Sequence, residues 1–105
     1  MTVVVKLGTS LIVGPGGRVR RSVLRRRAAE IAELVRAGTP VCVVSSGAIA
    51  LGMKSCGFKK RPKEMAELQA CAAIGQGKLM HAYESFFSKK KVHTAQLVLT
   101  RGGLE

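Results

Sequence analysis

The chain has 105 residues, of which 47% are hydrophobic, and its 18 lysines and arginines against six acidic residues give a formal net charge of +12 at pH 7. This length suits one small domain with a modest core. No apolar run approaches the roughly 18 residues of a membrane span, and Lys6 interrupts the first apolar stretch early, so we expect a cytoplasmic protein with neither a membrane segment nor a signal peptide.

The first half of the chain alternates between strand and helix patterns. A β-branched run predicts a strand over residues 2–7, and Gly14-Pro15-Gly16-Gly17 predicts a loop or hairpin tip. Apolar residues at helical spacing predict a helix from Ser22, as its N-cap, to about Arg36, with Gly38 in the C′ position. Pro40 begins a second strand, which ends near Ser45.

The second half predicts two helices and a further strand. One helix opens at Ser46-Gly47 and runs towards Cys56-Gly57, and a long one begins at Met65 and reaches Phe86, with a bend near Gly75-Gln76-Gly77. A third strand is expected over residues 92–99, with its buried part at residues 97–99. The order β-α-β-α-α-β predicts an α/β fold with a parallel sheet. Three strands make a small sheet with an open edge, which suggests a truncated domain.

The cysteines and histidines predict no metal site or disulfide framework. Cys42, Cys56 and Cys71 are odd in number and lack CxxC spacing, and we expect burial as small hydrophobes, with Cys42 in a strand and Cys71 in an alanine-rich helix. His81 and His93 have no neighbours that would complete a metal motif.

Two strand ends contain the candidate site. A β-branched run is followed by small hydroxyl and glycine residues in two places, at residues 3–10 and 41–48. Ligands of open α/β sheets bind at such strand ends. Lys6 beside Gly8 and Thr9 suits a phosphoryl group, although a lysine that reaches solvent from an edge strand explains it equally well. Ser46 is a helix N-cap, a donor to a substrate, or both, and capping is the commoner role.

A near match to the phosphate-binding P-loop is rejected. Gly47 and Gly52 have its spacing, but Met53 stands where that motif requires lysine, and the intervening residues favour a helix.

Four sequence blocks, in order, resemble the N-terminal signatures of the glutamate 5-kinase (γ-glutamyl kinase) family, whose blocks are shared by the kinase part of pyrroline-5-carboxylate synthase. They are VVKLGTS (4–10), VSSGAIALG (44–52), AAIGQGKLM (72–80) and AQLVLTR (95–101). The resemblance implies an amino acid kinase-like three-layer α-β-α sandwich with a mostly parallel sheet. Residues 1–105 would form the N-terminal part of that domain, without its nucleotide-base half and C-terminal domain.

The resemblance also implies an activity, the ATP-dependent phosphorylation of the L-glutamate γ-carboxylate in proline biosynthesis. By position, Lys6 is similar to the catalytic lysine that contacts the phosphates, and Gly8 and Thr9 to the adjoining phosphate loop. Ser46, with Gly47 and Ala48, is similar to the glutamate-binding turn. ATP and Mg²⁺ are the implied cofactors. In such reactions aspartates usually organise both the Mg²⁺ ion and the catalytic lysines. All six acidic residues of this chain are glutamate, so those aspartates are missing here.

Two other interpretations stay open. The isolated chain is expected to be inactive. The first alternative is a fragment that needs a complementary C-terminal half or a second copy of itself to cover the open edge of its sheet. The second alternative, suggested by the charge alone, is a small basic module that binds nucleic acid or another polyanion. Nucleic acid is not the expected partner, because the few aromatic residues are not interleaved with the basic runs.

Overall fold

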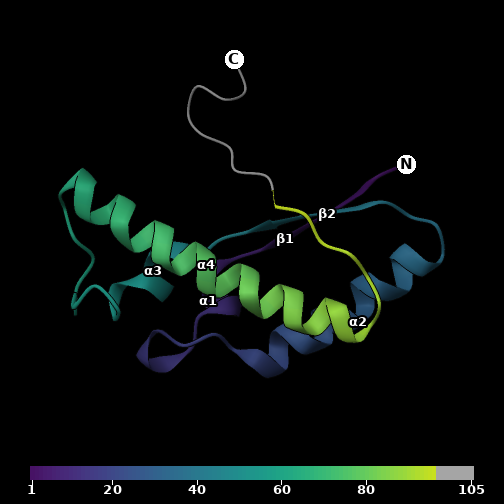
Figure 1. The fold of residues 1–105 in the computed structure, drawn as a ribbon, viewed down its shortest axis with the longest axis horizontal. Helices are drawn as coiled ribbons and strands as arrows, with labels where there is room; N and C mark the ends of the chain where they lie inside the picture. Colours follow the sequence, from purple (N-terminus) through teal and green to yellow (C-terminus); the bar gives the residue numbers. More distant parts are fainter. Residues whose placement is uncertain (97–105) are drawn as a thin grey trace, which may run out of the picture.

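The computed structural model describes residues 1–96, which form a two-stranded sheet with helices packed on one face (Figure 1). Its elements in chain order are β1 (Val3–Leu7), α1 (Thr9–Ile12), the 3₁₀ turn η1 (Pro15–Gly17), α2 (Arg21–Arg36), β2 (Val41–Ser45), α3 (Ala48–Met53) and α4 (Met65–Lys89).

The two strands are parallel, as predicted. Val3 pairs with Val41 and Leu7 pairs with Ser45, so both strands end at the same edge of the sheet. The connection between them is α2, which fits the long crossover that a parallel pair requires. The carboxyl ends of both strands therefore lie side by side, where the candidate site was expected.

The core lies between one face of the sheet and the helices α2 and α4. α4 packs against both α3 and α2, and it runs across the sheet in Figure 1. Arg21 and Arg25 of α2 place their guanidinium groups 4.8 and 5.7 Å from the centre of the Phe86 ring, which adds cation–π contacts at the edge of this core. The buried residues of the main cluster are Leu7, Ile12, Leu24, Ala28, Ile31, Leu51, Leu79, Ala82, Tyr83, Phe86 and Phe87.

Within residues 1–96, helices cover one face of the sheet, and the opposite face is exposed. Side chains alternate along a strand, and the outward set is exposed, with Val4 at 63% and Val44 at 46%. Cys42 lies on this face and is exposed, so its predicted burial is wrong. Since the described residues place helices on one face only, the α/β class is confirmed, and the full three-layer sandwich stays a prediction.

Several predicted boundaries need correction. α2 begins at Arg21 after Arg20, with no side-chain cap, so Ser22 lies inside the helix and is not its N-cap. α3 ends at Met53, earlier than predicted, and turns occupy residues 54–57. Residues 92–96 contain no strand, and the rest of the predicted third strand lies outside the described residues.

The other boundaries agree with the sequence. Gly38 follows the C-cap of α2 with φ +89°, as a C′ glycine does. The hairpin tip is confirmed by an antiparallel bridge between Val13 and Val19 around η1. α4 begins at Met65, as predicted, and is one continuous helix through Gly75–Gly77, and the Met65 side chain is 67% exposed. Within residues 1–96, no helix combines the length and apolarity of a membrane span.

Candidate functional site

Lys6 lies on the open face of the sheet at the end of β1. It pairs in register with Val44, while its neighbour Leu7 points into the core and is 3% exposed. The Lys6 side chain is exposed, and within residues 1–96 it makes no ion pair or side-chain hydrogen bond. Its ammonium is therefore available to an anionic ligand at the strand ends.

The loop after β1 and the turn after β2 lie against each other. The Ser46 amide donates a 3.0 Å hydrogen bond to the Leu7 carbonyl, which extends the strand pairing by one step. Gly47 follows in the left-handed region at φ +101°, and a Cβ there would lie 2.9 Å from Cγ2 of Val13 and 3.8 Å from Cα of Thr9. Only glycine meets both the dihedral and the space at this position.

In the structure, the residue that caps α3 is Gly47 and not Ser46. Gly47 occupies the N-cap position, and no side chain makes a capping hydrogen bond. The capping interpretation of Ser46 is wrong for that reason, and its role as a donor to a substrate stays a prediction. The helical conformation of Ala48–Met53 also agrees with rejection of the P-loop.

Two residues at this edge carry a contact that the sequence did not predict. The Tyr83 hydroxyl donates a 2.9 Å hydrogen bond to Oγ of Ser45, and Ser45 Oγ lies 3.5 Å from the Ser46 carbonyl, to which it donates a weak bond. Tyr83 thereby connects α4 to Ser45, the residue directly before the predicted glutamate-binding turn. The only sequence signal was a tyrosine on an otherwise apolar helix face, since a buried tyrosine hydroxyl usually finds a partner.

Burial raises the pKa of Tyr83 above its usual 10.0, and the hydrogen bond to Ser45 offsets part of this rise. Its hydroxyl therefore stays protonated and donates at neutral pH. The stability that depends on protonated Tyr83 is fully present below the unfolded pKa and is lost as the pH rises through the higher folded pKa.

We expect Tyr83→Phe to lower the free energy of unfolding by about 1 kcal/mol, because it removes one hydrogen bond and leaves the ring packing in place. The measurement is urea unfolding of both proteins at neutral pH and above pH 10. The difference between them should shrink at the higher pH, and equal stability at neutral pH would show that the bond contributes nothing.

α3 and α4 approach so closely that their contact requires glycine. A Cβ on Gly75 would overlap the Ala48 carbonyl oxygen, and a Cβ on Gly52 would overlap the Cys71 carbonyl oxygen. Both overlaps are with backbone, which cannot move aside as a flexible side chain can. The contact fixes Ala48, the last residue of the predicted glutamate turn, against the middle of α4.

The cysteines and histidines lie in different environments. Cys71 is fully buried as predicted, and burial, together with a hydrogen bond to Cys56, raises the pKa of its thiol. His81 and His93 are exposed. Within residues 1–96, no three histidine, cysteine or acidic side chains gather into a group that could hold a metal ion.

The site residues fit a phosphate group better than they fit Mg²⁺. Gly8 is the N-cap of α1, and a Cβ placed on it would meet nothing within 4 Å, so there is open space beside the first amides of α1. The first bonds of α1 run from the Leu11 and Ile12 amides to the Gly8 carbonyl, so the Thr9 and Ser10 amides precede the hydrogen bonds of the helix. Lys6 lies two residues before Gly8. Carboxylates for Mg²⁺, by contrast, are not brought to this edge by the described residues.

Comparison with known proteins decides the family. The model of the amino acid kinase family matches residues 1–105, the whole chain. The chain belongs to the amino acid kinase family. Its curated relatives include the glutamate 5-kinase of Ralstonia pickettii (strain 12J), which is 50% identical over 101 residues, covering 96% of this chain and 27% of the relative.

Two further relatives agree. The glutamate 5-kinase of Aromatoleum aromaticum is 47% identical over 102 residues, covering 97% of this chain and 28% of the relative. That of Carboxydothermus hydrogenoformans is 48% identical over 98 residues, covering 92% and 26%. This member of the amino acid kinase family thus spans about a quarter of the length of the curated relatives it matches.

Proposed function

We propose that the chain is the N-terminal part of a glutamate 5-kinase and supplies the glutamate-binding half of its site together with one phosphate contact. The whole enzyme would transfer the γ-phosphoryl group of ATP to the γ-carboxylate of L-glutamate, forming an acyl phosphate and ADP, as the first step of proline biosynthesis. The observation that carries this proposal is the 3.0 Å hydrogen bond from the Ser46 amide to the Leu7 carbonyl, which brings the two predicted halves together.

Each residue has a separate part in this proposal. Lys6 would stabilise the negative charge that develops on the transferring phosphoryl group, and its exposed position at the strand end supports this part. Gly8 and Thr9 would hold phosphate oxygens through backbone amides. Ser46, with Gly47 and Ala48, would bind glutamate, and the bond from Tyr83 to Ser45 would hold that turn in place.

The chain by itself would be inactive, because its 105 residues include no aspartate to organise Mg²⁺ and position the catalytic lysine. A complementary C-terminal half or a second copy would cover the open sheet face of Val4, Cys42 and Val44. Mg²⁺ would be held by carboxylates of that complementary part.

A chimera tests this function. Residues 1–105 replace the matching segment of the Ralstonia pickettii glutamate 5-kinase, and γ-glutamyl hydroxamate formation is measured with ATP and glutamate. We expect activity comparable to the parent enzyme from the chimera and none above background from the 105-residue chain. A folded but inactive chimera would refute the proposed function, and clear turnover by the chain alone would refute its incompleteness.

A further inference from the structure

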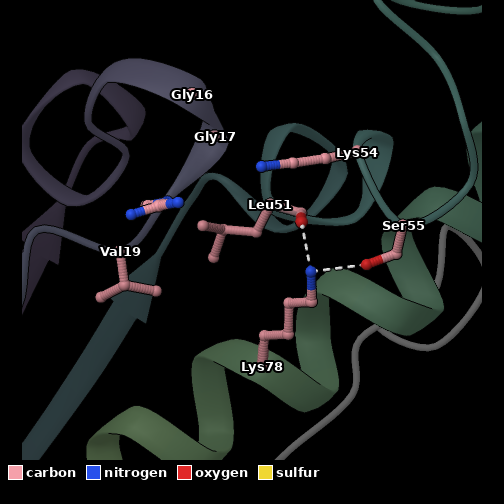
Figure 2. A pocket seen from close by; sticks show the side chains of 8 residues that line it. Gly16, Gly17, Val19, Leu51, Lys54, Ser55 and Lys78 are labelled. Atoms are coloured by element: carbon pink, nitrogen blue, oxygen red, sulfur yellow. Dashed lines mark hydrogen bonds between the residues drawn. The ribbon is translucent and has the colours of Figure 1, made fainter.

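A cationic cleft lies apart from the strand ends, between η1, the end of α3 and the middle of α4. Its volume is about 550 Å³, and its polar lining includes Arg18, Lys54, Ser55 and Lys78 beside the backbone of Gly16 and Gly17. Figure 2 shows these segments facing one another across the cleft. A neighbouring hollow shares both glycines and Lys54 and adds Lys59. None of the six candidate site residues lines either hollow.

One of the cations is held in place by the fold. Nζ of Lys78 donates to the Ser55 hydroxyl at 2.6 Å and to the Leu51 carbonyl at 3.3 Å (Figure 2). An ammonium group has three donors, so one N–H of Lys78 is left after these two bonds. Both partners are neutral, and the full positive charge of Lys78 stays uncompensated at the cleft.

Within residues 1–96, no carboxylate lines the cleft. Its lining contains three cations and no acidic residue. Among residues 1–96, the one ion pair joins Arg27 to Glu30 on α2, which does not line the cleft. Bringing like charges from three segments to one concave surface costs electrostatic free energy, and a bound anion would reverse the sign of that contribution.

We propose that this cleft binds a small molecule bearing a diphosphate or two phosphate groups. Three cations match several negative charges, and the volume lies within the range of about 300–1,000 Å³ that is typical of small-molecule sites. Val19 and Leu51 provide the apolar part of the lining. This site is separate from the proposed kinase site, and its occupancy does not depend on glutamate 5-kinase activity.

Pyrophosphate binding to the 105-residue chain tests the proposal, with titration calorimetry for affinity and amide chemical shifts for location. We expect binding at low salt, with the largest shifts at Gly16, Gly17 and Ser55. Lys54→Gln and Arg18→Gln should each weaken affinity by about tenfold or more, since each removes one charge-assisted contact. The matched control is Lys89→Gln, which removes the same charge from the last turn of α4 and should leave affinity unchanged.

The other outcomes overturn the proposal. Failure of the folded parent chain to bind pyrophosphate would do so, and equal weakening by the Lys89 and Lys54 variants would indicate diffuse attraction to a basic surface. Lys6→Gln distinguishes this cleft from the proposed kinase site. If that variant loses pyrophosphate binding while Lys54→Gln keeps it, the anion binds at the strand ends and the cleft is not its site. Circular dichroism confirms that each variant is folded.

Discussion

Replacing Lys6 with alanine in the chimeric kinase is expected to lower kcat by a factor of about 10²–10³, which is the usual loss when one preorganised group that stabilises transition-state charge is removed. Since the Lys6 side chain is exposed and makes no ion pair or side-chain hydrogen bond within residues 1–96, its removal should leave the stability of the fold unchanged. The measurement is the rate of hydroxamate formation at saturating ATP and glutamate, together with the urea midpoint of the chimera.

The matched control for Lys6 is Lys63→Ala, which removes an exposed lysine from the segment before α4. It should change kcat little. If both substitutions reduce the rate equally, Lys6 acts only through the overall charge, and its catalytic role is refuted. A drop in the urea midpoint with Lys6→Ala would instead assign the residue a structural role.

Gly75→Ala is expected to destabilise the chain by at least about 2 kcal/mol, because its Cβ would overlap the Ala48 carbonyl and force α3 away from α4. The effect opposes helix propensity, which alone favours alanine over glycine by about 1 kcal/mol. The measurement is urea unfolding followed by circular dichroism. In the chimera, we expect the same substitution to impair glutamate binding, because Ala48 ends the predicted glutamate turn.

Gly77→Ala, in the same helix, is the matched control. A Cβ at Gly77 would meet nothing within 4 Å, so we expect this substitution to stabilise the chain by up to about 1 kcal/mol. Opposite signs at two glycines separated by one residue would isolate the close approach of the helices. Stabilisation by both substitutions would show that α3 does not pack on α4 as described.

Local patterns were sufficient for most of the elements and for the family, although they did not predict the short helix α1. The parallel β1–α2–β2 unit, the turn at residues 14–17 and the long helix α4 follow from side-chain periodicity and from glycine and proline positions, which act over a few residues. The four sequence blocks indicated the kinase family, and the comparisons confirm it. The roles of Lys6, Gly8, Thr9, Ser46, Gly47 and Ala48 stay predictions.

Boundaries and caps were less predictable, because a capping preference is a small local free energy that neighbouring contacts override. Ser22 and Ser46 both have good capping side chains, yet Arg20 and Gly47 occupy the cap positions. At Gly47 the reason is visible, since the turn must take a positive φ and fit against Val13.

The sequence by itself determined the α/β class, the parallel β1–α2–β2 unit, the helices α3 and α4 and the family, but it did not predict the short helix α1. The tertiary structure alone decided which face of the strands is covered, and so left Cys42 exposed where burial was predicted. It also joined Tyr83 to Ser45, 38 residues apart, and assembled Arg18, Lys54 and Lys78 around one cleft. Periodicity predicts which residues share one face of a helix or strand, whereas these contacts depend on which distant segment packs against that face.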